Sequence, residues 1–309
     1  MEFSHVSVLL EECIQGLSIR PDGVYLDGTA GGAGHSREIA KRLEQGKGTL
    51  YSLDQDPDAI QTATERLKGL PAVVIQSNFR NAKMALQPYH VNQLDGALLD
   101  LGVSSHQLDV AERGFSYHAD APLDMRMSQS GITAADLVNT LSRDELAKIL
   151  KEYGEEPYAW AIAGKIVALR EQTPFETTGQ LAQAIISAMP AVVRRKDKNP
   201  ARRSFQGIRI AVNGELDALK EGLNEIFDLL APKGRFCIIT FHSLEDRVVK
   251  QQFRQWATAC TCPPDLPICV CGGKAKAKLI TKKPIEATSE ELEQNRRSRS
   301  AKLRILEKL

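Results

Sequence analysis

The sequence predicts an α/β fold in which a doubly wound parallel sheet is interrupted by a helical domain. Short apolar runs alternate with helical patterns up to Asp100 and again from Glu215 onward. Such alternation is typical of parallel strands joined by right-handed helical crossovers. Between Gln107 and about Arg203 the strand-like runs stop, which indicates a helical insertion.

The first strands are expected where short apolar runs are bounded by turn or acidic residues. These runs are Val24–Asp27, Thr49–Asp54, Ala72–Gln76 and Gly96–Asp100. Helical patterns lie between them, at Ser36–Leu43, Pro57–Lys68 and Asn81–Gln87. Proline opens the second of these helices, a position where its missing N–H is not needed.

The later part of the chain is expected to form the helical insertion and then the remaining helices and strand of the sheet domain. Amphipathic patterns predict helices at Ser142–Glu152, Glu155–Gln172 and Thr178–Ala188. A further helix is expected at Glu215–Leu229, a strand at Gly234–Thr240, and then a helix capped by Ser243 with Asp246 at its third position. We therefore expect residues 1–106 and 204–309 to form one discontinuous domain, and residues 107–203 to form the helical insertion.

Charge and composition restrict the class of protein. The chain of 309 residues has 42% hydrophobic residues and a net charge of +1, so it can bury a large core and is no polycation. Two basic stretches stand out: residues 194–209 hold seven Lys or Arg against one acid, and residues 274–309 hold eleven against five. These basic stretches are typical of a protein that contacts an anionic partner at a few places, or they are two solvated parts of the surface.

The sequence predicts a cytoplasmic protein. It holds no apolar run of about 18 residues, the length that a membrane span needs. The N-terminus lacks a basic flank and carries Glu11 and Glu12 in its apolar stretch, unlike a signal peptide. Six cysteines are then expected in a reducing compartment.

The residues VYLDGTAGGAGHS at 24–36 carry a specific local signal. Glycines let backbone N–H groups approach a ligand, because they have no side chain and accept positive φ. The dinucleotide spacing G-x-G-x-x-G fails, since Arg37 stands where glycine or alanine is needed after Gly32 and Gly34. Asp27 would repel a pyrophosphate and suits a cationic ligand such as S-adenosylmethionine. An NAD site and a glycine turn without a ligand remain the alternatives.

Further polar residues end the other strands, at the sheet edge where α/β proteins bind ligands. Asp54 comes twenty residues after Gly34, the spacing of a carboxylate that binds an adenosyl ribose. Asp56 competes for that role, or caps the next helix. Phe79 either flanks an adenine or belongs to the core. Asp100 is placed to accept a hydrogen bond from an amine under methylation and to favour its growing positive charge, or else to cap local backbone groups.

Taken together, these blocks resemble the MraW family of small-subunit ribosomal RNA methyltransferases, which act on the N4 of a cytidine. The resemblance covers essentially the whole chain and is specific, because many separate blocks occur in the right order. They are DGTAGGAGHS at 27–36, LDLGVSSHQLD at 99–109, ERGFS at 112–116, PLDMRM at 122–127, YGEE at 153–156, FQGIRI at 205–210, FHSLEDRVVK at 241–250 and RRSRSAKLR at 296–304.

The resemblance implies a class I (Rossmann-like) methyltransferase sheet and an RNA-recognition role for the insertion. It implies methyl transfer from S-adenosylmethionine to a decoding-centre cytidine in 16S rRNA of the small ribosomal subunit. Contacts to the methyl donor are implied at Ala33, Gly34, His35, Asp54, Phe79, Asp100 and Gln107. The chain departs from the family at Ala33 and Ala121, where glycine is usual, and at His106, where proline is usual. Ala33 then needs a negative φ or carries some strain.

The reaction expected is direct displacement, in which the cytidine amine attacks the methyl carbon. Asp100 is the expected catalytic residue, since a hydrogen-bond acceptor localises the delocalised N4 lone pair. The base must leave its stack to be reached, which favours single-stranded or distorted RNA. Candidates for stacking the base, each of which ordinary packing also explains, are Phe115, Tyr117 and Phe205. Expected phosphate contacts are Arg194, Arg195, Lys196, Arg202 and Arg203.

Four cysteines in the tail leave a metal site open. Cys260, Cys262, Cys269 and Cys271 lie within twelve residues. Their one-residue spacing is tighter than is usual for paired zinc ligands, so we assign none of them to a metal. The other function classes are a methyltransferase for a small molecule or a protein, and a non-catalytic RNA-binding relative. The oligomeric state stays open, with a dimer among the alternatives.

Overall fold

The computed structural model describes residues 7–196, 199–260, 262 and 273–309. The chain forms two compact units: the sheet unit, Met1–Gly102 with Leu216–Leu309, and the helical unit, Val103–Glu215. Both boundaries differ from those expected after residues 106 and 203, and the second differs more. The helix that crosses residue 203 packs on helices of the insertion, so it belongs with them and not with the sheet.

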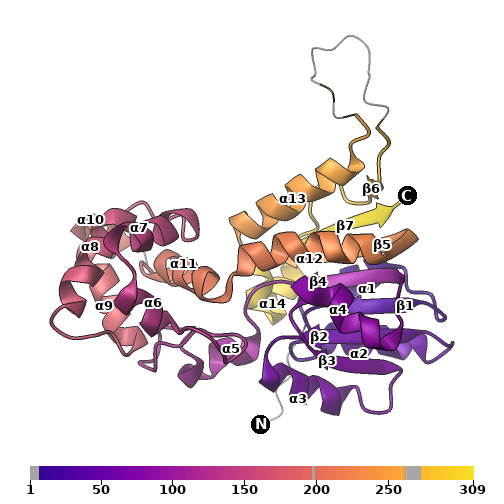
Figure 1. Ribbon diagram of the computed structural model, residues 1–309, viewed down its shortest axis with the longest axis horizontal. Helices are drawn as coiled ribbons and strands as arrows, with labels where there is room; N and C mark the ends of the chain where they lie inside the picture. Colours follow the sequence, from indigo (N-terminus) through magenta and orange to yellow (C-terminus); the bar gives the residue numbers. More distant parts are fainter. Residues whose placement is uncertain (1–6, 197–198, 261, 263–272) are drawn as a thin grey trace. The chain divides into compact units, whose positions relative to one another are not determined.

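The sheet has seven strands in the order β3-β2-β1-β4-β5-β7-β6 (Figure 1). β1 to β5 are parallel, and β7 runs antiparallel to both of its neighbours. The strand order reverses between β1 and β4, and such a switch point opens a crevice for ligands at the carboxyl ends of the strands. The strands are β1 Val24–Asp27, β2 Thr49–Asp54, β3 Ala72–Gln76, β4 Leu94–Asp100, β5 Leu230–Thr240, β6 Ala277–Leu279 and β7 Lys302–Lys308.

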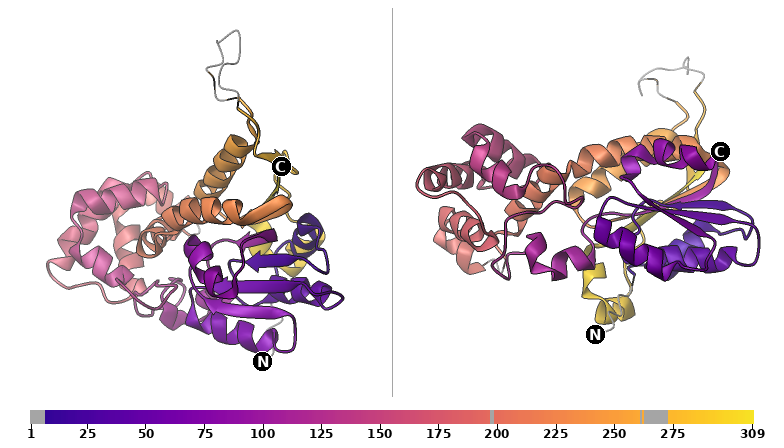
Figure 2. Two further views of the ribbon diagram at one scale, coloured as in Figure 1. Left: turned by 45° about the vertical axis from the view of Figure 1, so that its right-hand side comes forward. Right: turned by 60° about the horizontal axis from the view of Figure 1, so that its bottom comes forward.

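Helices cover both faces of this sheet, because alternate strand residues point to opposite sides and both sets are apolar (Figure 2). On one face, Leu26, Leu99 and Phe236 pack with α4, α12 and α13. On the other face, Tyr25 and Leu98 pack with α1, α2 and α3. These helices are α1 Leu10–Leu17, α2 Gly34–Leu43, α3 Pro57–Arg66, α4 Ala82–Leu86, α12 Glu215–Leu229 and α13 Ser243–Ala257, and a short α14, Ser289–Gln294, precedes β7.

The helix caps agree with the sequence in one case and differ in another. Asp56 caps α3 by accepting a hydrogen bond from Asp58 N at 3.1 Å. The predicted cap of α13 is wrong by one residue. His242 caps this helix and Glu245 occupies its third position, where its carboxylate accepts from the backbone N–H of Phe241 at 2.8 Å.

The helical unit has a hydrophobic core of its own, which includes Leu146, Ile162, Ile185 and Ile208. Among the helices of the described residues in either unit, none combines the length and apolar character that crossing a membrane requires. The helices of this unit are α5 Ser105–Asp109, α6 Ala134–Thr140, α7 Arg143–Glu152, α8 Ala159–Arg170, α9 Thr178–Ala188, α10 Ala191–Lys196 and α11 Arg202–Asn213.

Candidate functional site

Asp27 holds the glycine turn in place through hydrogen bonds to its side chain. It ends β1, is 1% exposed, and accepts hydrogen bonds from Ser36 Oγ at 2.6 Å and from Thr29 N at 3.0 Å. Burial raises the pKa of Asp27, and these hydrogen bonds oppose the rise. Both carboxylate oxygens are therefore used to hold the turn. Asp27 thus has a structural role in the turn, and its expected suitability for a cationic ligand stays a prediction.

Thr29 connects this anchor to the end of the neighbouring strand. Its hydroxyl oxygen accepts a hydrogen bond from Asp100 N at 2.7 Å and lies 3.4 Å from Asp27 Oδ1. The turn after β1 and the end of β4 are thereby fixed to each other. Neither Thr29 nor Ser36 was predicted from the sequence, although both stand in the first block that resembles the MraW family.

Asp100 presents an acceptor at the switch point. Its Oδ1 atom is buried and has no hydrogen-bond partner among the described residues, while 26% of the side-chain surface is exposed. Burial, and then the nearby carboxylates of Asp27 and Glu245, raise its pKa to about 8. An ionised acceptor in such surroundings is unfavourable unless a cation or an N–H donor meets it. The site thus fits a positively charged ligand.

His35 lies beside this carboxylate and is buried, with 5% exposure. Its Nε2 lies 3.0 Å from the carbonyl oxygen of Val8, which can only accept, so Nε2 carries the proton. Its Nδ1 lies 3.7 Å from Asp100 Oδ2. His35 is therefore a buried residue near the N-terminus of α2.

The glycine turn is closely packed and locally strained. Ala33 has φ 59°, so its backbone is left-handed and strained and does not have the negative φ that was the other expectation. The family usually has glycine at this position. A left-handed backbone costs a residue with a Cβ roughly 1–2 kcal/mol. A Cβ added at Gly28 would lie 2.5 Å from Leu99 and 3.0 Å from Phe79, and one at Gly34 would lie 1.9 Å from Ser7 Oγ. The turn therefore favours glycine at Gly28, where Leu99 and Phe79 occupy the space of a methyl group, whereas at Gly34 the side chain of Ser7 would have to move.

Asp54 is a second carboxylate at the same edge of the sheet. It accepts hydrogen bonds from Gly31 N at 2.8 Å and from Asp56 N at 2.9 Å, one on each oxygen. Burial raises its pKa to about 6, against these two hydrogen bonds. Each oxygen keeps a lone pair, so the carboxylate can still accept from a pair of hydroxyls. It also binds the turn to β2.

Phe79 lies partly buried after β3 and contacts two glycines. Its Cβ lies against Gly28, and a Cβ at Gly222 of α12 would lie 2.4 Å from its ring. The ring is thus packed on α12 and joins the hydrophobic core as a peripheral member. Asn78 beside it donates to Gln55 Oε1 at 2.8 Å, which connects the ends of β3 and β2.

Gln107 is the remaining residue that was predicted to contact the methyl donor, and it belongs to the helical unit. It is 4% exposed and forms a capping box with Ser104, whose N–H donates to Gln107 Oε1 at 3.0 Å. The site residues that the structure places in the sheet unit are Ala33, Gly34, His35, Asp54, Phe79 and Asp100.

The candidates for stacking a base lie in the helical unit, mostly in its core. Phe115 is 8% exposed and Phe205 is 4% exposed, so both are packing residues. Tyr117 is half-buried and meets the Phe205 ring edge-on at 4.8 Å. Of the expected phosphate contacts, Arg194, Arg195, Arg202 and Arg203 are exposed.

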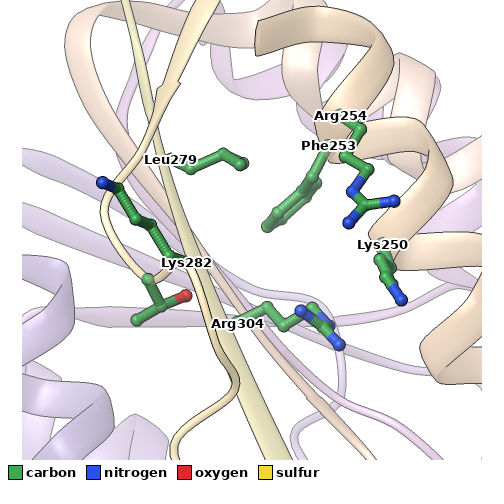
Figure 3. Close-up of a pocket in the computed structure, with 7 residues that line it drawn as sticks. Lys250, Phe253, Arg254, Leu279, Lys282 and Arg304 are labelled. Atoms are coloured by element: carbon green, nitrogen blue, oxygen red, sulfur yellow. The ribbon is translucent and has the colours of Figure 1, made fainter.

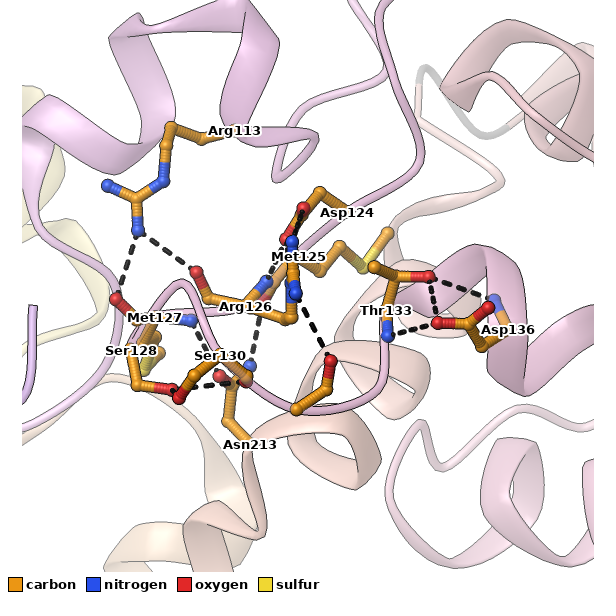
Figure 4. Close-up of polar contacts among 11 residues, drawn as sticks. Arg113, Asp124, Met125, Arg126, Met127, Ser128, Ser130, Thr133, Asp136 and Asn213 are labelled. Atoms are coloured by element: carbon orange, nitrogen blue, oxygen red, sulfur yellow. Dashed lines mark hydrogen bonds and ion pairs between the residues drawn. The ribbon is translucent and has the colours of Figure 1, made fainter.

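A rigid loop in the helical unit contains the block at 122–127 (Figure 4). Arg113 donates to the carbonyls of Arg126 and Met127 at 3.0 and 3.1 Å, and Asn213 donates to that of Met125 at 2.8 Å. Met125 has φ 62°, a left-handed conformation that the carbonyl contacts hold in place. Asp124 and Arg126 form an ion pair at 2.6 Å within the same loop.

The possible metal site at the four cysteines of the tail lies partly outside the described residues. Cys260 is exposed and Cys262 is half-buried, whereas Cys269 and Cys271 fall in a segment that the structure does not describe. The open assignment of these four cysteines is therefore unchanged.

Comparison with known proteins gives matches over the full chain. Residues 2–309 match the model of the MraW methylase family. The chain is 53% identical over 312 residues to ribosomal RNA small subunit methyltransferase H of Lachnospira eligens, covering 100% of this chain and 99% of that protein. It is also 53% identical over 312 residues to the protein of the same name from Clostridioides difficile, and both chains are covered fully, at 100% each.

Proposed function

The chain belongs to the MraW methylase family, and from this we propose that it methylates the exocyclic N4 of a decoding-centre cytidine in 16S rRNA of the small ribosomal subunit. It is a methyltransferase whose methyl donor is S-adenosylmethionine. The relatives' names support ribosomal RNA as the substrate. The N4 position and the cytidine rest on the family resemblance and on the chemistry of Asp100.

The observation that carries the proposal is the buried Oδ1 of Asp100 at the switch point, which has no hydrogen-bond partner within the part of the chain that the structure describes. S-adenosylmethionine supplies an activated methyl group on a sulfonium, together with a cationic α-ammonium. In this proposal, Asp54 binds the ribose hydroxyls and Phe79 flanks the adenine.

In the proposed mechanism, Asp100 accepts a hydrogen bond from the target amine. This contact localises the nitrogen lone pair for attack on the methyl carbon of the donor. The N–C bond would form as the methyl–sulfur bond breaks, which would release S-adenosylhomocysteine, and one proton of the methylated amine would pass to the Asp100 carboxylate or to solvent. The carboxylate also stabilises the positive charge that develops on nitrogen, in a site where burial strengthens the interaction. Thr29 fixes Asp100 through its backbone N–H, and His35 faces the carboxylate from the other side.

The test is methyl transfer from radiolabelled S-adenosylmethionine to purified small subunits, followed by nucleoside analysis. Label recovered as N4-methylcytidine is expected, and Asp100→Ala is expected to lower the rate by at least about 100-fold, the size of one general-base contribution. Asp56→Asn serves as the control, because Asp56 caps α3.

The same experiment separates the other function classes. Donor binding without label on subunits, naked RNA or DNA would contradict the proposal and favour a small-molecule or protein acceptor. Absence of donor binding would favour the non-catalytic RNA-binding relative.

A further inference from the structure

The basic tail of the chain builds a pocket in the sheet unit that the proposed reaction does not use. The pocket lies between α13 and the segment that connects β6 to β7 (Figure 3). Phe253 and Leu279 face each other across it and supply apolar walls. Its lining residues are Lys250, Phe253, Arg254, Leu279, Thr281, Lys282 and Arg304.

Cationic groups gather on one side of this pocket. Lys250, Arg254 and Arg304 direct their charged ends to the same side, whereas the amine of Lys282 points the other way. Arg304 is buried, with 8% exposure, and two of its nitrogens donate to Asp246 at 2.7 and 3.0 Å. Its guanidinium is therefore held in a fixed orientation at the floor of the pocket.

The pocket carries a net positive charge. None of the described residues that line it is acidic, and Asp246 is already paired with Arg304. Glu307 belongs to the opposite face of β7, where it pairs with Arg235 at 3.2 Å. Thr281 accepts a hydrogen bond from Ile305 N at 2.9 Å, which leaves its hydroxyl proton for another acceptor. Cations beside a hydroxyl donor suit a phosphate group.

We propose that this pocket binds a phosphate of the RNA backbone close to the base that is methylated. The inference rests on the proposed function and names a contact of the same substrate. α13 starts just beyond the end of β5, and β5 pairs with β4 up to Asp100. At 1.5 Å per residue, Lys250 and Arg254 lie about 10 and 16 Å along the helix from Ser243. A strand of RNA at the switch point thus reaches them within a few nucleotides.

The test compares two double variants in binding a labelled 12-nucleotide single-stranded RNA over a range of salt concentrations. Lys250→Gln with Arg254→Gln removes both charges and keeps helix propensity. The affinity is expected to fall about tenfold at low salt, and the slope of log affinity against log salt to fall by about 1.4. Lys47→Gln with Lys68→Gln is the matched control, because both lysines are exposed in the same unit.

Activity on small subunits gives the second readout. The Lys250/Arg254 variant is expected to raise KM for the subunit, with kcat and donor affinity unchanged. Equal RNA binding by this variant and the control would overturn the inference, even if rRNA is methylated. Conversely, the Lys250/Arg254 variant could lose RNA binding while the original chain shows no rRNA methylation. In that case the inference about the pocket would hold and the proposed function would be wrong.

Discussion

Asp100 combines a raised pKa with a proposed catalytic role that needs its ionised form. Without a ligand, the pKa of about 8 means that the carboxyl is largely protonated at neutral pH. A cationic methyl donor favours the carboxylate, so donor binding must lower this pKa and expel the proton. The acceptor needed for catalysis is therefore created when the donor binds.

This coupling predicts that donor binding near pH 7 releases a proton. Affinity is expected to increase with pH by up to about tenfold per unit until pH reaches about 8, and then to level off. Calorimetric titration in two buffers of different ionisation enthalpy measures the proton directly. S-adenosylhomocysteine lacks the sulfonium charge and is expected to release less. An affinity that stays flat from pH 6.5 to 8.5, with no buffer dependence, contradicts the coupling.

Gly28 offers a second prediction at the scale of single residues. A methyl group at this position would overlap Leu99 and Phe79, so Gly28→Ala is expected to lower the free energy of unfolding by roughly 1–3 kcal/mol. Donor affinity should fall with it, because Phe79 has to move.

Gly32→Ala is the matched control for this substitution. The nearest atom to its new Cβ, Arg66 Nη1, lies at 3.5 Å, and its φ is not in the left-handed region. Its stability is expected within about 0.5 kcal/mol of the original chain. Equal denaturation midpoints for the two variants would show that close packing at Gly28 is not what the turn needs.

At the scale of elements, local patterns predicted the strands that lie inside the parallel sheet. β1, β2 and β3 have the predicted bounds. β1 and β2 lie inside the sheet and are continuous apolar runs, as buried parallel strands are, whereas β3 is a half-buried strand at the edge of the sheet. β7 was not predicted. Its residues Lys302, Arg304 and Lys308 break the apolar run, and only the long-range partner Asp246 explains the burial of Arg304.

The site shows the same division between local and long-range information. Asp54 and Asp100 could be found from strand ends and spacing. Thr29 could not, because its role depends on the adjacency of β1 and β4, which are far apart in the sequence. Likewise, the buried position of His35 depends on Val8 of the segment that precedes α1.

The attachment of β7 to α13 gives a prediction at this scale. Asp246→Ala leaves the Arg304 guanidinium buried without its partner, and is expected to cost about 3 kcal/mol of unfolding free energy. Asp246→Leu with Arg304→Met should recover most of the loss. Asp217→Ala breaks an exposed pair with Lys220 and should cost less than about 0.5 kcal/mol. If Asp246→Ala and Asp217→Ala gave similar chemical denaturation curves, this would contradict the prediction that the ion pair between Asp246 and Arg304 attaches β7 to α13.

At the scale of the whole molecule, the chain joins two units that each have a core. The helical unit, Val103–Glu215, starts three residues after Asp100, so the chain passes directly from the candidate catalytic residue into the insertion. Its core draws on the loop at Leu123–Met127 as well as on α6 to α9 and α11. A unit of this size with its own apolar core has the features of an independently folding domain.

We therefore expect the fragment 103–215 to fold when produced alone. Circular dichroism should show a predominantly helical spectrum and a single cooperative thermal transition, as two-state domains of this length do. Asn213→Ala tests the role of the loop, because Asn213 donates to Met125 O and accepts from Met127 N at 2.8 Å each. Removal of both contacts is expected to lower the transition temperature by several degrees, since about 1–2 kcal/mol is lost. A fragment that melts without cooperativity would show that the helical unit depends on the sheet unit for its fold.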